Sequence, residues 1–211
     1  AWGAVAQRGR ARGWECKEAV FANQFMAVTA HPLATEAARN VLKSGGTAVD
    51  AAVTAQLILN LVEPQSSGIG GGAFMLYWDA KDQTLFSFDG RETAPAAADA
   101  DYFRDETGNV MKWREARLGA RAVGVPGTLH LLYTVHQQFG NHPWADLFKP
   151  AIALSREGFV VSPRMAKSIE GAQASLQRFE GTREYFFTEQ GNPLPAGHRL
   201  SNPASADTLE I

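Results

Sequence analysis

Hydrophobic and polar positions alternate most regularly in the first third of the chain, where they predict two helices joined by a glycine turn. Apolar residues recur at helical spacing from Leu33 to Val41, and Gly45-Gly46 then supplies a left-handed stop. Thr47 can cap a second helix over 48–62, with Asp50 near the positive end of its dipole. Because this second helix is apolar around most of its circumference, we expect it to be mostly buried.

Strand patterns flank these helices. Residues 26–30 read as a short buried strand, and residues 73–79 as a strand that is apolar on both faces and therefore covered on both sides. A polar turn leads to 84–89 as its hairpin partner. The polar stretch 99–120 predicts a surface excursion, and 122–125 predicts another short strand.

Helical patterns dominate the rest of the chain. One runs from Thr128 to the stop at Gly140, two short pieces cover 144–149 and 151–157, and another starts at Ser162-Pro163 and reaches about Phe179. Asn202-Pro203 opens a last helix whose end carries no cap, from which we expect a piece of a longer polypeptide. Buried strands with covering helices predict an α/β (α+β) layered domain.

Composition limits the class of partner. The 211 residues are 45% hydrophobic and 20% charged, with a formal net charge of −2, so no basic field would attract nucleic acid. No apolar run is long enough for a transmembrane segment. Cys16 is the only cysteine, which excludes a disulfide within the chain. We expect residues 1–24 to form an extended, locally basic arm and residues 25–211 to form the folded part.

Two familiar kinds of site are not supported. Gly68–Ala73 fits the dinucleotide-binding pattern by letter, but a helix precedes it and a strand follows, the reverse of the order that pattern needs. We interpret Gly70, Gly71 and Gly72 as positions of close backbone approach or positive φ. The histidines lack metal-ligand spacing, so neither a metal nor a cofactor is expected; they are His31, His130, His136, His142 and His198. The chain shows no complete catalytic set.

Arg91 is the one candidate substrate-binding residue. It follows directly after a predicted strand, where side chains line clefts, and its planar guanidinium suits a carboxylate in two-point contact. The alternative is an ion pair with Glu92 or Asp89, and from the residues alone this alternative is favoured.

Several motifs together resemble those of the γ-glutamyltranspeptidase family. They agree in order and spacing and are His31-Pro32-Leu33-Ala34, Gly45-Gly46-Thr47-Ala48-Val49-Asp50-Ala51-Ala52, Val62-Glu63-Pro64-Gln65-Ser66-Ser67-Gly68-Ile69-Gly70-Gly71-Gly72-Ala73-Phe74, Asp89-Gly90-Arg91-Glu92-Thr93-Ala94-Pro95 and Gly124-Val125-Pro126-Gly127. The similarity is strong over about residues 25–165 and weaker beyond.

The resemblance implies an N-terminal-nucleophile hydrolase with an αββα sandwich, incomplete in this chain. Members are made as a precursor that cuts itself into a large and a small subunit, and the new N-terminal Thr of the small subunit is the nucleophile. It takes the γ-glutamyl group from glutathione or related donors and passes it to water, an amino acid or a dipeptide. The resemblance also implies a periplasmic or secreted location, and it assigns Arg91 to the donor's α-carboxylate.

On this basis the chain is the N-terminal part of a large subunit, with no catalytic residue of its own and the small subunit as its partner. The apolar surfaces of 48–62 and 73–79 likewise predict a complementary chain that buries them. Two alternatives stay open. One is a glutaryl or cephalosporin acylase of the same superfamily, and the other is a non-catalytic fragment that binds a carboxylate or a partner.

Overall fold

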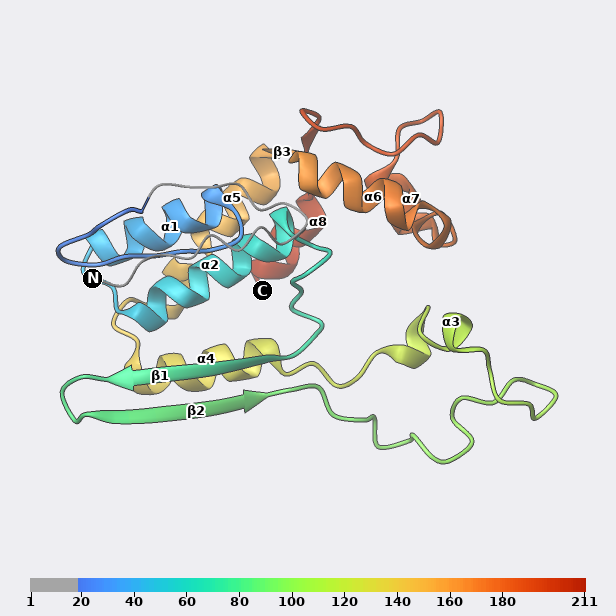
Figure 1. Ribbon diagram of the computed structural model, residues 1–211, viewed down its shortest axis with the longest axis horizontal. Coiled ribbons are helices and arrows are strands. Elements are labelled where there is room, and N and C mark those ends of the chain that lie inside the picture. Colours follow the sequence, from blue (N-terminus) through green and yellow to red (C-terminus); the bar gives the residue numbers. More distant parts are fainter. Residues whose placement is uncertain (1–18) are drawn as a thin grey trace.

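The computed structural model describes residues 19–211. Cys16 and most of the predicted arm lie outside this range, and residues 19–24 are exposed. Figure 1 shows a bundle of helices above a long hairpin, with an extended loop at one side. The helices are α1 (Pro32–Lys43), α2 (Ala48–Val62), α3 (Trp113–Ala116), α4 (Thr128–Phe139), α5 (Lys149–Glu157), α6 (Pro163–Leu176), α7 (Glu180–Phe186) and α8 (Pro203–Leu209). Short 3-10 turns cover Ala120–Ala122 and Trp144–Leu147.

Helix α2 forms the centre of the core, as its sequence predicts. It packs against α1, α4 and α5, and its apolar side chains are almost inaccessible, among them Val53 and Leu57 with 0% and 1% exposed. Its start is fixed by a capping box, in which the Thr47 hydroxyl accepts the Asp50 N–H and the Asp50 carboxylate accepts the Thr47 N–H. The preceding turn uses Gly45 at φ 92°, so the predicted left-handed stop is confirmed.

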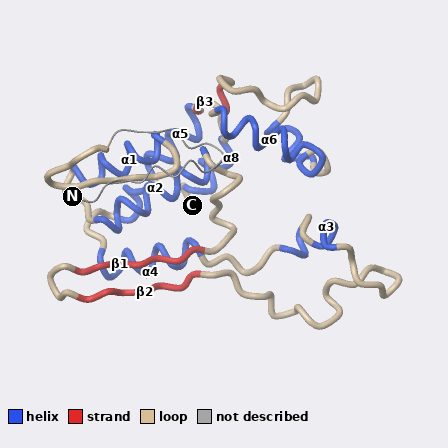
Figure 2. The backbone as a smooth tube through the Cα atoms, viewed as in Figure 1, coloured by secondary structure: helices blue, strands red, loops and turns tan. Residues whose placement is uncertain are grey.

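The hairpin consists of β1 (Ala73–Asp79) and β2 (Thr84–Gly90), paired antiparallel from Ala73↔Gly90 to Asp79↔Thr84. Figure 2 shows its two strands beside α4. Helix α4 covers one face, where the Phe139 ring lies 4.4 Å from that of Tyr77 and 5.0 Å from that of Phe86, centroid to centroid. These aromatic contacts join the hairpin to the helical core.

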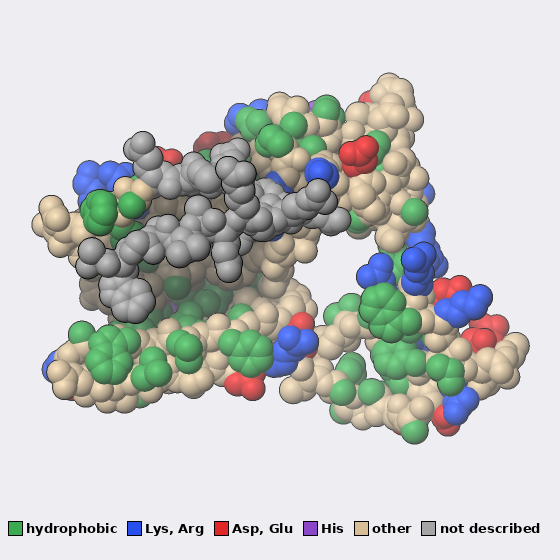
Figure 3. Space-filling model, in the orientation of Figure 1, with side chains coloured by type: hydrophobic (Ala, Val, Ile, Leu, Met, Phe, Trp, Pro, Cys, Tyr) green, Lys and Arg blue, Asp and Glu red, His purple; other side chains and the backbone are tan. Residues whose placement is uncertain are grey.

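The opposite face of the hairpin is exposed, so the prediction that 73–79 is covered on both sides is wrong for this chain. Phe74, Leu76 and Trp78 are 66%, 71% and 56% exposed, and Leu85 on β2 is 60% exposed. Figure 3 shows these hydrophobic side chains along the front of the hairpin. We call Phe74, Leu76, Trp78 and Leu85 the outer face. Nothing in residues 19–211 packs on it, because α4 occupies only the other side.

Two other strand predictions are also wrong. Residues 26–30 have no regular secondary structure, with Met26 and Val28 51% and 81% exposed, since no described strand lies alongside them. Residues 122–125 begin in a 3-10 turn, and only Val125 makes a bridge, to Thr93. The predicted surface excursion is confirmed as a largely exposed loop between β2 and α4, interrupted by α3 (Figure 2).

Among the C-terminal helices, α5 packs on α2, whereas α6 and α7 pack on each other. Asn202 caps α8 as predicted, its side chain accepting the Ser205 N–H, and α8 lies against α5. Pro150 lies in the first turn of α5 rather than separating two helices, and α6 ends at Leu176, with α7 as an unpredicted extra turn. A two-residue pair, β3 (Phe159–Val160) with β4 (Arg199–Leu200), closes this region. The described chain thus mixes helix and strand, with helices on one side of its main hairpin.

Candidate functional site

The loop between α2 and β1 begins with a buried charged turn. Glu63 is 2% exposed, and its Oε2 accepts a hydrogen bond from Gln65 Nε2 at 2.6 Å. Arg164 Nε, at the start of α6, lies 3.3 Å from the same oxygen. The Glu63 carbonyl accepts the Ser66 N–H at 2.9 Å. The buried carboxylate is therefore paired, and it fixes the point where the chain leaves α2.

The glycines that follow bring two backbone segments into contact. Gly71 accepts hydrogen bonds from the N–H groups of Gly127 and Thr128, at 3.0 and 3.2 Å, which attaches the loop to the start of α4. A Cβ on Gly72 would lie 2.8 Å from both the Arg91 Cα and the Glu92 nitrogen, closer than real Cβ contacts allow. Close approach, as interpreted from the sequence, therefore holds at Gly72.

Gly70 and Gly71 do not share this constraint. A Cβ on Gly70 would meet nothing within 4 Å, and one on Gly71 would make only ordinary contacts of 3.5 Å or more. None of the three glycines has a positive φ. The expectation that all three have special backbone roles is corrected to Gly72 alone, because only at Gly72 would a Cβ lie too close to another backbone segment.

Arg91 lies at the end of β2, directly against this glycine. Its backbone N–H donates to Asp89 Oδ1 at 2.9 Å, and its side chain is 69% exposed. Arg91 Nε is 3.1 Å from Glu92 Oε2, so the two side chains form an ion pair. The geometry does not meet that of a hydrogen bond, and Glu92 Oε2 has no hydrogen-bond partner within the described residues. The alternative weighed from the sequence, pairing with Glu92, thus occurs in this chain. Such an exposed pair is weak, and within residues 19–211 the terminal guanidinium nitrogens make no hydrogen bond or ion pair.

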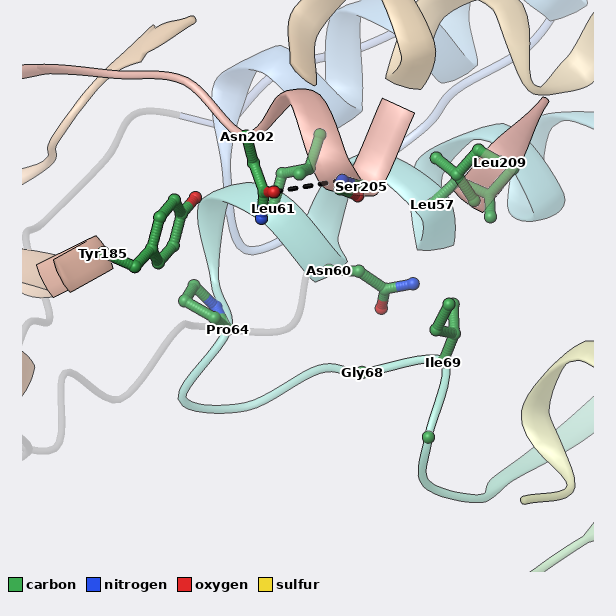
Figure 4. Close-up of a pocket in the computed structure, with 11 residues that line it drawn as sticks. Leu57, Asn60, Leu61, Pro64, Gly68, Ile69, Tyr185, Asn202, Ser205 and Leu209 are labelled. Atoms are coloured by element: carbon green, nitrogen blue, oxygen red, sulfur yellow. Dashed lines mark hydrogen bonds between the residues drawn. The ribbon is translucent and has the colours of Figure 1, made fainter. Parts of the chain in front are cut away.

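Two small cavities border the loop. One, of about 390 Å³, is lined by Gln56, Ser67, Gly71, Gly72 and Glu92 among others, so it reaches the residue that follows Arg91. The other, of about 320 Å³, lies on the opposite side of the loop between α2 and α8. Figure 4 shows Asn60 pointing into this second cavity, with Ile69 and Leu209 near it and Gly68 at its edge.

A polar cluster that sequence reasoning missed lies beneath α2. The Asp50 carboxylate, fully buried, accepts backbone N–H groups from Asn141 and His142 as well as Thr47. His136 Nε2 lies 3.6 Å from Asp50 Oδ1 and donates to the His142 carbonyl at 2.9 Å. The local cap was visible in the sequence, but the contacts 91 and 92 residues away were not. This cluster joins two turns and is structural.

The remaining histidines do not assemble with it into a metal site. Among the described residues, no group of three or more His, Cys, Asp or Glu side chains is arranged to hold a metal ion. His142 Nε2 instead pairs with the Ser44 hydroxyl at 3.0 Å, and His31 Nδ1 accepts the Leu33 N–H as the cap of α1.

None of the helices in residues 19–211 has the length and apolar character needed to span a bilayer.

Comparison with known proteins agrees with the motifs. The family model described as gamma-glutamyltranspeptidase matches residues 34–211. The glutathione hydrolase proenzyme of Bacillus subtilis (strain 168) is 39% identical over 197 residues, which make up 93% of this chain and 33% of that protein. This chain therefore spans about a third of the length of that curated relative.

Solved structures with a similar fold agree with this sequence match. The structure of Helicobacter pylori gamma-glutamyltranspeptidase superposes with a TM-score of 0.85 at 31% identity, covering 91% of this chain and 54% of that one. A cephalosporin acylase from Bacillus halodurans superposes at 0.77 with 27% identity, covering 97% and 38%. The predicted fold class is confirmed as part of an N-terminal-nucleophile hydrolase. Since the family model and the relatives both match most of its length, the chain belongs to the gamma-glutamyltranspeptidase family.

Proposed function

We propose that the complete protein transfers or hydrolyses the γ-glutamyl group of glutathione and related γ-glutamyl amides, and that residues 25–211 are the first part of its large subunit. The observation that carries this proposal is the match to a glutathione hydrolase proenzyme over 93% of the chain. The enzyme is active only as a heterodimer, because the nucleophile belongs to the small subunit.

The chemistry follows from the family resemblance. The hydroxyl of the small subunit's N-terminal Thr adds to the γ-amide carbon of the donor, assisted by the Thr amine as base. The C–N bond then breaks, the proton goes to the departing amine, and a γ-glutamyl ester remains on the enzyme. Water, an amino acid or a dipeptide attacks this ester, which releases glutamate or a new γ-glutamyl amide and restores the hydroxyl.

The first test of this proposal is the identity of the partner. We expect the full-length precursor to yield two polypeptides, and N-terminal sequencing of everything that co-purifies with this chain should find a subunit that begins with Thr. A single uncut polypeptide that hydrolyses γ-glutamyl amides would contradict the proposed processing. Fractionation of cells that express the full-length protein tests the proposed periplasmic or secreted location.

Arg91 is proposed to bind the α-carboxylate of the donor. It is an exposed cation next to Glu92, which lines the cavity at Gly72, and its terminal nitrogens are available for a bidentate contact. A charge-assisted pair of this kind contributes roughly 1.5–3 kcal/mol. In the complete enzyme, Arg91→Ala should therefore lower kcat/KM for γ-glutamyl donors by roughly 10- to 150-fold, mostly through KM. Arg91→Lys should recover only part of the loss, because an ammonium lacks the planar fork.

The matched control is a donor whose α-carboxylate is replaced by a neutral amide. The wild-type enzyme should discriminate strongly against this donor, whereas Arg91→Ala should hardly discriminate. Equal discrimination by both enzymes would mean that Arg91 only pairs with Glu92, the contact that it makes in this structure.

A second candidate function is an acylase, favoured by the superposition on a cephalosporin acylase. A glutaryl amide keeps the terminal carboxylate of a γ-glutamyl amide and lacks its α-amino group, so Arg91 could bind either acyl group. A panel that compares kcat/KM for matched γ-glutamyl and glutaryl amides separates the two functions. Faster turnover of the glutaryl amides would overturn the proposed donor.

A further inference from the structure

Two polar side chains on the apolar helix α2 bind the start of the glycine loop. Gln56 Nε2 donates to Ser67 Oγ at 2.6 Å and to Asn60 Oδ1 at 3.0 Å. The Ser67 hydroxyl in turn donates to Asn60 Oδ1 at 2.8 Å. The three side chains thus close a triangle of hydrogen bonds between one face of the helix and the loop.

The donor and the acceptor of each hydrogen bond define the role of each residue in this triangle. Asn60 Oδ1 accepts two hydrogen bonds, while its buried Nδ2 has no partner in the described part of the chain. The amide therefore serves this triangle only as an acceptor, and its free Nδ2 lies at the second cavity of Figure 4. Gln56 contributes only as a donor. Ser67 is the member that belongs to the loop, and its hydroxyl both donates and accepts.

Ser67 is connected to Arg91 by short, consecutive contacts. The next residue, Gly68, accepts the Gly71 N–H at 3.3 Å, which folds the loop into a turn. The Gly71 carbonyl is held by the first N–H groups of α4. Gly72 then rests against the backbone of Arg91, with no room for a side chain between them. A shift of the loop at Ser67 would therefore be passed to the backbone that carries Arg91.

We infer that Gln56, Asn60 and Ser67 are positioning residues that hold the glycine loop against Arg91 and thereby fix the site for the donor carboxylate. The inference rests on the proposed role of Arg91 and adds to it the part of α2 that supports the site. It also explains why a mostly apolar, buried helix carries the polar pair Gln56 and Asn60 at i,i+4 spacing, in addition to Asp50 and Thr54.

The test uses the complete, processed enzyme. Ser67→Ala removes the hydroxyl that joins loop and helix, and we expect it to raise donor KM about three- to tenfold with kcat changed less than twofold, because the carboxylate is bound equally in the ground and transition states. Ser67→Thr keeps the hydroxyl and should restore most of the affinity. Ser201→Ala is the control for loss of a serine hydroxyl, since the Ser201 side chain is exposed and lines neither of the two cavities at the loop.

A double-mutant cycle with Arg91→Ala distinguishes positioning from a general structural effect. If Ser67 acts through Arg91, Ser67→Ala should raise donor KM in the wild-type background and leave it nearly unchanged in the Arg91→Ala background. It should also weaken discrimination against the α-carboxamide donor. An equal change in both backgrounds, or no change in either, would overturn the inference.

Gln56→Met removes both donated hydrogen bonds at similar side-chain length, and it is carried through the same cycle in case Ser67→Ala does not mature. The two proposals can fail separately. If Arg91→Ala loses discrimination while Ser67→Ala and Gln56→Met keep it, only the positioning inference is wrong. If Arg91→Ala discriminates as the wild type does, the proposed role of Arg91 itself is wrong.

Discussion

Helix α2 and strand β1 of the hairpin are both apolar on nearly all sides in the sequence, yet they have different surroundings in the structure. Leu57 on α2 is 1% exposed, and the helix is enclosed by α1, α4 and α5. The hairpin is covered on one side only, and Leu76 on its outer face is 71% exposed. The same residue type in the same kind of pattern is thus fully buried in one region and mostly exposed in the other.

The difference shows which layers of the fold are complete within the described residues. All the helices that cover α2 lie within the described residues, so its burial is complete here, and the prediction that a complementary chain buries 48–62 is wrong. The outer face of the hairpin would need a second layer, and the helices of residues 19–211 pack elsewhere. Because the curated relatives are about three times as long, we expect the rest of the complete protein to cover this face.

The largest effect expected from this comparison concerns two leucines. In the isolated chain, Leu57→Ala should lower the free energy of unfolding by about 3 kcal/mol, because it leaves a cavity in the core, whereas Leu76→Ala should lower it by less than about 1 kcal/mol. Urea unfolding followed by tryptophan fluorescence measures both values.

The complete protein gives the control for this pair. There, Leu76→Ala should become about as destabilising as Leu57→Ala, since a covering layer would bury it. If Leu76→Ala stays mild in the complete protein, the outer face is solvent-exposed in the mature enzyme as well, and the expectation of a second layer is wrong.

Local signals in the sequence predicted much of the helical region. The capping box of Thr47 and Asp50, the stop at Gly45 and the cap at Asn202 each depend on a few neighbouring residues, and each is confirmed. Asp50 also shows the limit of such signals. Its role in capping α2 could be predicted from neighbouring residues. Its contacts with Asn141 and His142 depend on how α4 packs and could not be predicted from the sequence.

The main errors in the predicted fold concern strands, whose burial depends on distant partners. Residues 26–30 have the composition of a strand, but no described segment pairs with them. For the candidate site, the residues alone favoured pairing of Arg91 with Glu92, and only the family resemblance pointed to a substrate. The hydrogen bond that Gln56 donates to Ser67 and the one that Ser67 donates to Asn60 were not predicted, although Gln56 and Asn60 are polar residues on a mostly apolar helix.

The end of the hairpin beside the glycine loop sharpens the comparison, since two backbone segments meet there at Gly72 and leave no room for a side chain. Gly72→Ala would place a methyl group 2.8 Å from the Glu92 nitrogen and the Arg91 Cα, so one backbone segment must move. We expect a loss of roughly 1–3 kcal/mol in the free energy of unfolding, together with a raised donor KM in the complete enzyme.

Gly70→Ala is the matched control, because its Cβ would meet nothing within 4 Å. This variant should be neutral or slightly stabilising, since alanine restricts the unfolded chain. Equal destabilisation by the two substitutions would show that general flexibility of the loop, rather than close packing against Arg91, determines the need for glycine.

The smallest expected effect is a pH dependence confined to the helical region. His31 caps α1 through Nδ1, which accepts the Leu33 N–H at 3.3 Å. Burial lowers the pKa of His31 from its ordinary value of 6.5, and the nearby Glu63 charge opposes this only in part. A protonated Nδ1 cannot accept, so acid removes the cap.

Because the pKa of folded His31 lies below its ordinary value, the unfolded chain takes up the proton first as the pH falls. The stabilising contribution of His31 is therefore complete above about pH 6.5 and is lost as the pH falls from there through the lower folded pKa. His31→Asn keeps a capping side chain that does not titrate, so it should flatten the decline in unfolding free energy over this range, by less than about 1 kcal/mol. His130→Asn, at an exposed histidine outside any cap, controls for the loss of an imidazole. Urea unfolding at a series of pH values measures the effect, and parallel curves for wild type and His31→Asn would show that protonation of the cap does not contribute to acid sensitivity.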